Sequence, residues 1–454
     1  MPAFILYPLS FLVVLGIMIV VHEWGHYAAA KLLGVRVEVF SVGFGPRLLG
    51  FRRGETDYRI SAIPLGGYVK MSGENPMEPA TGDPAEFMSH PRWHRFLIAV
   101  AGPFMNVALA VGLLTGLYVF HYEEPTYLDE AAVVGSVKDG SPAAKAGIQR
   151  DDVIANIEGI ANPRWKQALY KAALNPGQPL RVDVQRGSQT RSLTIIPEPV
   201  GANRYGAAGW EPKEPVEITS LGAVGPNKEK PAVSAGLQMG DVVIAADALP
   251  ITSLTGLFDH LQDGKGKPSE LALLRHGQEM KITVHPILGV AKGETEAFYR
   301  IGVGSQRITV KRLPLAEAWK SSLADNRENC VMLADLLQKL IRGKGNIKQI
   351  SGPIGIGQAA GDAVEEGLQD KNWFHLLQLV TMISLNLGLF NLLPIPIMDG
   401  GVILLLLLEG LMRRDISLVV KERIYQTAFV FLVLFASVVI FNDVTKVFSS
   451  GKLP

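Results

Sequence analysis

The sequence has 454 residues, with 44 Lys and Arg against 43 Asp and Glu, 48% apolar residues and one cysteine. This length allows about three domains, which excludes a single small binding module. A formal net charge of +1 gives no electrostatic basis for a nucleic-acid partner, and one cysteine excludes an intramolecular disulfide framework. Only 19% of the residues are charged, below the share of roughly 25% in an average soluble domain.

Charged residues are almost absent from four stretches, each long enough to cross the hydrocarbon core of a bilayer as a helix. These stretches cover residues 3–21, 96–120, 374–398 and 424–442. Soluble cores rarely supply four such stretches, so the sequence predicts a multi-span α-helical membrane protein with four transmembrane helices. The predicted spans, with their flanking motifs, are residues 1–33, 96–121, 373–410 and 422–443.

Lys and Arg gather between the first two spans and between the last two. The positive-inside rule therefore places residues 34–95 and roughly 410–423 in the cytoplasm, with both termini and the long region 121–373 outside it. A cleaved signal peptide is the alternative for the N-terminus. The basic leading region of such peptides is missing here, so we expect the first span to be retained.

The first span runs directly into His22-Glu23-Trp24-Gly25-His26. Positions i and i+4 of a helix share one face, so both imidazoles can reach one metal ion. Zinc suits imidazole ligands and generates a hydroxide nucleophile near neutral pH, and Glu23 stands where a carboxylate can take the proton from that water. The alternative is a pair of interfacial histidines bonded to the backbone, which leaves Glu23 unexplained.

The cytoplasmic region 34–95 contains strand-like segments separated by glycines, including residues 58–63 and 65–71. A peptide bond in a helix is shielded by its own hydrogen bonds and must be unwound before attack. A strand edge beside the metal could hold the unwound segment by backbone hydrogen bonds. Gly67, Tyr68 and Val69 are therefore candidate substrate-binding residues in a membrane-associated β region. An ordinary cytoplasmic hairpin is the alternative.

Two features accompany the second span. His90 and His94 also stand four residues apart, but a proline separates them and no Glu accompanies them. We expect this pair to be an interfacial anchor rather than a second metal site. Within the span, Gly102-Pro103 permits close packing or a kink, and we expect the polar Asn106 to face the interior of the helix bundle.

The outer region contains an internal repeat, because seven of the twelve residues in segment 142–153 recur in segment 231–242. Two copies indicate a tandem pair of domains rather than a solenoid. The Ala-Gly turn followed by Asp and apolar strand residues resembles PDZ domains, which implies two extracytoplasmic α+β domains at 128–198 and 214–288. Such domains bind extended segments at a sheet edge, so we expect them to recognise or filter the outer ends of a substrate. Occluded grooves in domains that act as spacers are the alternative.

Residues 306–372 are expected to hold an extracytoplasmic amphipathic helix, over 313–342, and a linker. The helix has the spacing of one that lies on the outer leaflet or packs on the repeated domains. At Ser351-Gly352-Pro353-Ile354 a Gly-rich connection opens towards the third span.

The third span contains the sequence Asn391-Leu-Leu-Pro-Ile-Pro-Ile-Met-Asp399-Gly400-Gly401. The two prolines should break the helix, and the glycine pair permits unusual dihedral angles. Irregular backbone at membrane depth is tolerated only inside protein or beside a water-filled cavity. Asp399 is therefore placed where a carboxylate could complete a metal site. A proline kink followed by an interfacial Asp is an equally open interpretation of this segment.

The histidine motif and the proline-broken third span together resemble the site-2 protease family of intramembrane zinc metalloproteases. The match is close to its bacterial branch, the regulator-of-sigma-E type with two PDZ domains, and it extends over nearly the whole chain. The resemblance implies one Zn2+ per chain, with His22, His26 and Asp399 as its ligands. It also implies that Glu23 is the general base and that Asn386 and Asn391 contact the substrate.

The same resemblance implies a multi-pass protein of the bacterial inner membrane, with its active site towards the cytoplasm. It implies cleavage of the transmembrane segments of single-pass membrane proteins. The implied substrates are anti-sigma factors after a first cut by another protease, and remnant signal peptides.

Two other classes of protein compete with the protease. A membrane-anchored scaffold would carry a degenerate metal site, whereas the four motif residues are intact. A metal-ion transporter should have polar residues along more than one span. The second and fourth spans offer little beyond Asn106 and Asn442, so the protease is the expected function.

Overall fold

The computed structural model describes residues 3–75, 82–225, 227–290, 297–305 and 307–449. The chain forms two compact units. The helical unit comprises Met1–Tyr122, Lys311–Arg342 and Ile350–Pro454, and the repeat unit comprises Glu123–Val310 and Gly343–Gln349.

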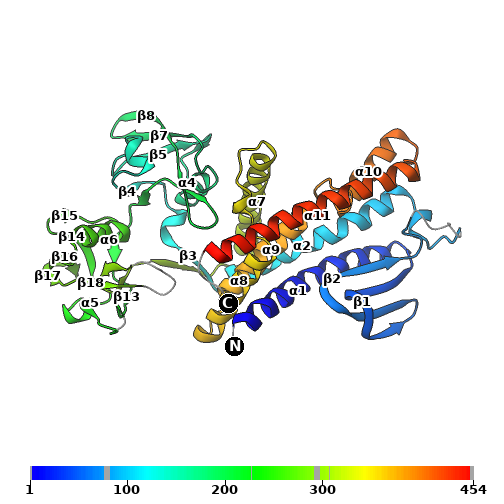
Figure 1. Ribbon diagram of the computed structural model, residues 1–454, viewed down its shortest axis with the longest axis horizontal. Coiled ribbons are helices and arrows are strands. Elements are labelled where there is room, and N and C mark those ends of the chain that lie inside the picture. The colour runs from blue at the N-terminus through cyan, green and yellow to red at the C-terminus, as the bar shows by residue number, and fades with distance from the viewer. Residues whose placement is uncertain (1–2, 76–81, 226, 291–296, 306, 450–454) are drawn as a thin grey trace. The chain divides into compact units, whose positions relative to one another are not determined.

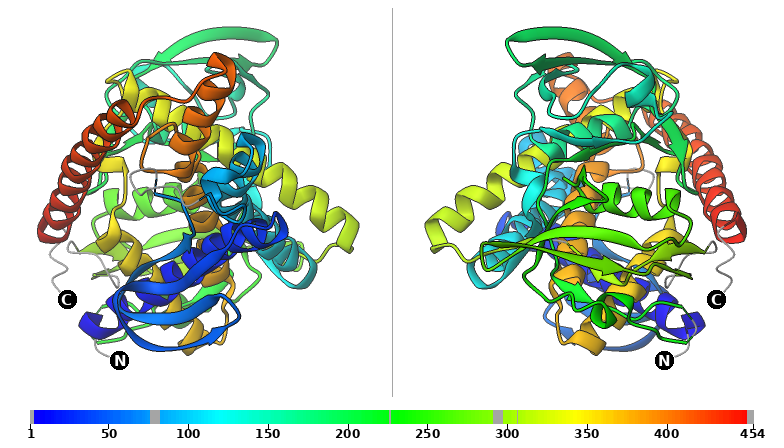
Figure 2. Two further views of the ribbon diagram at one scale, coloured as in Figure 1. Left: turned by 90° about the vertical axis from the view of Figure 1, so that its right-hand side faces the viewer. Right: turned by 90° about the vertical axis from the view of Figure 1, so that its left-hand side faces the viewer.

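Four helices of the helical unit are long and apolar enough to cross a membrane, as the sequence predicted. They are α1 (Ala3–Leu32), α2 (Arg92–Phe120), α9 (Phe374–Asn391) and α11 (Leu418–Ser449). Both α1 and α9 pack against α2, whose most apolar window is 44% buried. The corresponding window of α11 is only 11% buried, and this helix runs along the margin of the unit (Figures 1 and 2). The centre of the unit is therefore the group α1, α2 and α9.

Glycines allow α1 and α2 to touch. A Cβ atom on Gly25 would overlap the carbonyl oxygen of Ala101, and Gly102 lies equally close to α1. No side chain larger than hydrogen fits between backbones at this separation. The close packing expected at Gly102-Pro103 is confirmed.

The third apolar stretch is two helices rather than one. Helix α9 ends at Asn391, and α10 (Asp399–Met412) begins after a short irregular segment that contains both prolines. The break was expected, but the reason given for the glycine pair was wrong. Neither Gly400 nor Gly401 has a positive φ angle. Instead, a Cβ on Gly400 would overlap the carbonyl oxygens of Leu392 and Leu393, so this glycine provides room for the irregular segment.

Strands β1 (Val37–Arg53) and β2 (Thr56–Met71) form the region between α1 and α2, followed by the short 3-10 helix η1 (Phe87–Ser89). Residues 37–42 of β1 pair with 67–71 of β2 and also with 57–60, so the 67–71 segment lies at an edge of a curved sheet. The sheet exposes large apolar side chains, including Phe44, Leu48, Leu49, Phe51, Ile60 and Ile63. An exposed apolar surface of this kind suits contact with lipid.

Two further helices belong to the helical unit, α7 (Leu315–Ile341) and α8 (Pro353–Asp370). Helix α7 packs on α2, where the Ser322 hydroxyl donates to the carbonyl of Val111 at 2.9 Å. The expected amphipathic helix is present, but its pattern did not identify this partner.

Helix α8 occupies the place where a Gly-rich connection was expected, and that expectation was wrong. Pro353 takes the first helical position, where its missing N–H is harmless. The Asp443 carboxylate of α11 accepts the backbone N–H groups of Gly352, Ile354 and Gly355 at 3.0–3.1 Å. The glycines reflect close packing, because a Cβ on Gly361 would overlap the ring of Tyr7.

The repeat unit contains two copies of one arrangement. The first copy comprises β4 (Val134–Val137), α3 (Pro142–Lys145), β5 (Val153–Ile157), β6 (Ile160–Ala161), α4 (Trp165–Ala173), β7 (Leu180–Arg186) and β8 (Gln189–Ile195). The second comprises β12 (Val216–Glu217), α5 (Pro231–Ser234), β14 (Val242–Ala246), β15 (Leu249–Pro250), α6 (Leu254–Asp263), β16 (Ser269–Arg275) and β17 (Gln278–Val284). The sheets run β6-β5-β7-β8 and β12-β14-β16-β17, with β15 paired to β14 as β6 is to β5.

Shorter elements complete the two copies and their connections. They are β3 (Tyr122–Pro125), η2 (Thr126–Asp129), β9 (Glu198–Val200), β10 (Tyr205–Ala207), β11 (Trp210–Pro212), β13 (Ser220–Leu221), β18 (Ile287–Gly289), β19 (Phe298–Arg300), β20 (Val303–Gly304), β21 (Ile308–Lys311) and η3 (Ile347–Gln349). Each copy has its own apolar core, around Trp165 in the first and Leu257 in the second.

An ion pair is repeated along with the sheets. Arg186 bonds the buried Asp152 through two nitrogens at 2.7 Å, and Arg275 bonds the buried Asp241 in the same way at 2.7 Å. In both copies the Asp also accepts a backbone N–H three residues earlier, at 2.8 Å. The internal repeat predicted from the sequence is therefore confirmed as a structural repeat.

Candidate metal centre

The two histidines of the first span lie on one face of α1, as their spacing predicted. Their Nε2 atoms are 3.2 Å apart, and the residues are only 7% and 9% exposed, for His22 and His26 respectively. Glycines on α1 and α2 allow this close, buried arrangement, because Gly102 leaves room for the His26 ring.

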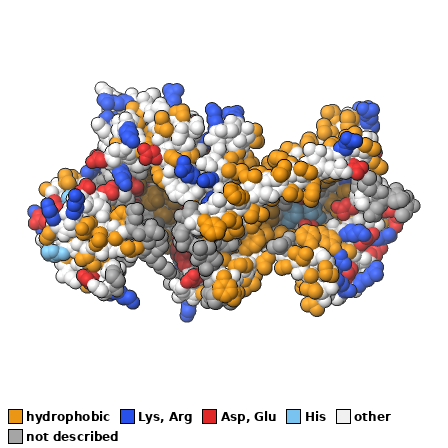
Figure 3. All heavy atoms as spheres, in the orientation of Figure 1, with side chains coloured by type: hydrophobic (Ala, Val, Ile, Leu, Met, Phe, Trp, Pro, Cys, Tyr) orange, Lys and Arg blue, Asp and Glu red, His pale blue; other side chains and the backbone are white. Residues whose placement is uncertain are grey.

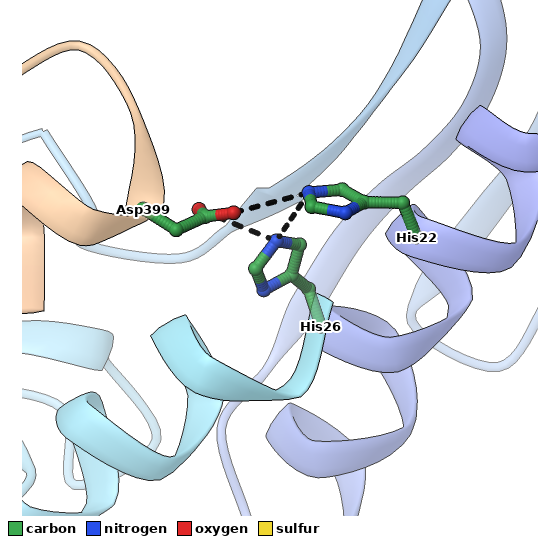
Figure 4. A group of neighbouring side chains, drawn as sticks. All are labelled: His22, His26 and Asp399. Carbon is green, nitrogen blue, oxygen red and sulfur yellow. Dashed lines mark hydrogen bonds and ion pairs between the residues drawn. The ribbon is translucent and has the colours of Figure 1, made fainter. Parts of the chain in front are cut away.

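Asp399 reaches both histidines from the first turn of α10. Its carboxylate oxygens lie 3.1 Å from the Nε2 of His22 and 3.4 Å from that of His26 (Figure 4). One ligand atom from each residue lies within 4.8 Å of the other two. Among the described residues this is the one group of three or more His, Cys, Asp or Glu side chains with such spacing. Residues from the two ends of the sequence thus form one cluster.

The Nδ1 atom of each imidazole also has a hydrogen-bond partner. The Nδ1 atom of His26 lies 2.8 Å from the carbonyl oxygen of Ile98, and the Nδ1 of His22 lies 3.2 Å from the amide of Asn106. A carbonyl oxygen can only accept, so His26 carries its hydrogen on Nδ1 and directs the Nε2 lone pair towards Asp399. Two imidazoles and one carboxylate are a donor set that fits a catalytic Zn2+, which keeps a further position open.

A cavity of about 490 Å3 adjoins the three residues, and Glu23 lines it beside them. The edge segment of β2 forms another wall, through Gly66, Gly67, Tyr68 and Val69. A Cβ on Gly67 would lie 2.9 Å from the carbonyl oxygen of Ser41 and 3.4 Å from the Cγ of Glu23, so the strand passes directly beside this carboxylate. All three candidate residues of the strand are therefore at the cavity.

The two asparagines of the third span differ in position. Asn391, the last residue of α9, lines the cavity, whereas Asn386 is not among its lining residues. Sequence reasoning missed Glu74, which also lines the cavity, and missed the contact between Asn106 and His22. Neither belongs to the two motifs, although the expectation that Asn106 faces the bundle interior was correct.

His90 and His94 are not part of a second group of three or more metal-ligating side chains among the described residues. Their Nδ1 atoms lie 3.0 Å apart, but no third ligand joins them within the part of the chain that the structure describes.

In the space-filling view, histidine side chains are visible in a hollow of the helical unit, between hydrophobic surfaces (Figure 3). A polar centre among apolar walls is typical of a functional site inside a membrane protein.

Comparison with known proteins identifies the family. The model of the family described as peptidase family M50 matches residues 10–435. The chain belongs to this family. Three full-length relatives agree with the match. The regulator of sigma E protease of Salmonella typhi is 32% identical over 96% of this chain and 98% of its own length.

The regulator of sigma-E protease RseP of Escherichia coli is 30% identical, with the same two coverages. A Neisseria meningitidis protein that carries the name zinc metalloprotease is 31% identical, again over 96% of this chain and 98% of its own. The chain is thus a membrane-embedded zinc metalloprotease of the site-2 type. This class excludes the scaffold and the metal-ion transporter that the sequence had left as alternatives.

Proposed function

We propose that this enzyme cleaves the transmembrane segments of single-pass membrane proteins in the bacterial inner membrane. Anti-sigma factors that another protease has already cut outside the membrane are the proposed main substrates, with remnant signal peptides as a second class. The names of the relatives, which refer to regulation of sigma E, support the first class.

One observation carries the proposal. His22, His26, Asp399 and Glu23 line a single cavity with an edge strand, in a unit built on four apolar helices. Ionisable side chains among membrane-spanning helices are costly unless they are paired or functional. Their presence here therefore favours a protease that acts within the membrane over a soluble one.

The chemistry divides among the cavity residues as follows. His22, His26 and Asp399 hold one Zn2+, which supplies Lewis-acid chemistry and acidifies water when bound. Glu23 takes the proton of the attacking water and returns it to the leaving amine. Its place one residue after His22, beside the strand, puts this carboxylate between the ligands and the expected path of the peptide.

The edge strand provides the proposed means of holding the substrate. Gly67, Tyr68 and Val69 lie at the sheet edge, where an unwound segment can add by backbone hydrogen bonds. Asn391 lines the same cavity and can bond the peptide from the other wall. We also propose a substrate contact for Asn386. This residue does not line the cavity, so it would contact the substrate at another point.

Orientation follows from the charge pattern. The Lys- and Arg-rich segments support a proposed orientation with the metal centre near the cytoplasmic side, and the repeat unit and both termini outside the cytoplasm. We propose that the two copies of the repeat unit are PDZ domains that bind or filter the outer ends of substrates. Their short helices, sheets and separate cores support a domain of this size.

Cleavage of a single-pass model substrate by the purified full chain in liposomes tests the proposal. The wild type is compared with Glu23→Gln, and with Glu55→Gln as a control on the exposed part of the β region. Bound zinc is measured in all three. We expect zinc in every protein, cleavage by the wild type and the control, and at least a 100-fold loss for Glu23→Gln, in line with general-base catalysis. Equal cleavage by Glu23→Gln would contradict its role, and a wild type without zinc would contradict the site.

A further inference from the structure

We propose that Asn106 of α2 is a positioning residue of the metal centre. It selects the tautomer of His22 in which the Nε2 lone pair is available to zinc. The inference rests on the proposed zinc site and adds to it a residue outside both sequence motifs.

Asn106 is held firmly between three helices. The residue is 0% exposed, and its side-chain Nδ2 lies 3.2 Å from the Nδ1 of His22 on α1. Its backbone carbonyl accepts the hydroxyl of Ser384 on α9 at 2.9 Å. A Cβ on Gly388 of α9 would lie 3.2 Å from the Cβ of Asn106, so no larger residue fits there without a shift. The backbone and Cβ of Asn106 are therefore packed closely against α9, with the amide next to the imidazole of His22.

The amide has an unused acceptor. Its Oδ1 atom is buried and has no hydrogen-bond partner among the described atoms. The two ends of an amide have almost the same shape, so their assignment is decided by hydrogen bonding. Turning the amide over brings this oxygen to the Nδ1 of His22, where it can accept an N–H.

The two orientations have opposite consequences for metal binding. If the NH2 group faces His22, Nδ1 must be the acceptor, and the hydrogen of the imidazole sits on Nε2. That hydrogen would point at the Nε2 of His26 and at Asp399, 3.2 and 3.1 Å away, and would block coordination. If the oxygen faces His22, the hydrogen sits on Nδ1 and Nε2 is free. Only the second orientation is compatible with zinc.

The other histidine provides the comparison. His26 is fixed by the backbone carbonyl of Ile98, which no substitution removes. His22 is fixed by a side chain, so its tautomer can be tested by mutation. Outer partners of this kind change metal affinity about 10–100-fold when they are lost.

Three variants of the full chain separate positioning from packing. Asn106→Leu keeps the volume but removes the acceptor. Asn106→Asp supplies a carboxylate, which can only accept and so enforces the same tautomer. Thr115→Val is the control, because this buried hydroxyl on the same helix bonds only the nearby carbonyl of Val111.

Zinc affinity is measured by competition with a chelator, and the visible absorption spectrum is recorded with Co2+ in place of zinc. We expect Asn106→Leu to bind zinc about 10–100-fold more weakly than the wild type and to show an altered Co2+ spectrum. Asn106→Asp and Thr115→Val should remain within a few-fold of the wild type, by the same reasoning. The thermal unfolding of the metal-free proteins shows whether each variant folds.

A merely structural role predicts the reverse order, because burying a carboxylate costs more than burying Leu. Wild-type affinity in Asn106→Leu, or a loss in Asn106→Asp as large as in Asn106→Leu, would overturn the inference. A wild type that binds no zinc would instead overturn the proposed site itself.

Discussion

Gly102 of α2 lies directly against the imidazole of His26: a Cβ atom at this position would overlap the Nε2, Cε1 and Cδ2 atoms of the ring. Helix α2 carries none of the proposed metal ligands, but its backbone at Gly102 contacts the His26 ring and so limits where this ligand can lie.

The first prediction follows from this contact. Gly102→Ala should displace the His26 ring and lower zinc affinity at least 10-fold, although alanine is favoured over glycine in a helix by about 1 kcal/mol. Gly112→Ala on the same helix is the matched control, since nothing lies within 4 Å of a Cβ there. Chelator competition measures both. Equal zinc affinity in the two variants would show that the ring has room to move.

The asparagines of the third span give the second prediction. Asn391→Ala should lower kcat/KM about 10-fold, the effect of one lost hydrogen bond of roughly 1.4 kcal/mol to the substrate. Asn386→Ala should have the smaller effect, because Asn386 does not line the cavity. The measurement is the rate of cleavage in liposomes over a range of substrate concentrations. A larger effect at Asn386 would mean that substrate takes a route outside this cavity.

The cap on α8 gives the third prediction. Asp443→Ala should remove the hydrogen-bond acceptor of three backbone N–H groups at the start of α8, those of Gly352, Ile354 and Gly355. Loss of a helix cap costs about 1 kcal/mol, so we expect exchange of the α8 amides with deuterium to rise roughly 5-fold. Ser437→Ala is the control, because this exposed hydroxyl of α11 bonds only its own helix, at Val433. Unchanged exchange in Asp443→Ala would mean that water replaces the carboxylate without cost.

The fourth prediction concerns pH and the second copy of the repeat. Burial alone would raise the pKa of Asp241, but the hydrogen bonds from Arg275 and from the backbone of Gln238 outweigh it and hold the pKa below the usual 3.8. A carboxyl whose pKa is lowered in the folded state stabilises the fold above the unfolded pKa. That contribution is lost as the pH falls through the folded pKa.

Hydrogen exchange of β16 and β17 in the full chain should therefore become faster as the pH drops below about 4, after correction for intrinsic rates. In Arg275→Met the exchange should already be fast at neutral pH, because the buried carboxylate has lost its partner. The exposed pair of Lys281 and Glu270 offers a control in Lys281→Met, which should leave the pH dependence unchanged. An identical pH profile in the wild type and Arg275→Met would contradict this account.

Local sequence patterns predicted much of this structure. The apolar stretches predicted the four spans, and the i, i+4 spacing placed His22 and His26 on one face of α1. The twelve-residue repeat predicted two copies of one fold. Each of these features depends on residues close together in the sequence, where helix geometry or hydropathy alone decides the outcome.

Features that depend on distant partners were missed. Helix α8 was expected to be a connection, because its glycines look flexible until Tyr7 and Asp443 are seen beside them. The contact of Asn106 with His22 joins two helices through a single polar pair, and no local pattern marks it. The glycines after Asp399 were assigned to unusual dihedrals, whereas close packing explains them. Spacing along the chain reveals a shared face, but not what packs against it.

The cluster of His22, His26 and Asp399 also sets an order of events in biosynthesis. Its two histidines enter the membrane with the first helix, whereas its carboxylate arrives only with α10, near the end of the chain. A nascent chain therefore carries an incomplete ligand set while the repeat unit is being made. The proposed ligand set is complete only once α10 has been made, so the chemistry of the site becomes available late in synthesis.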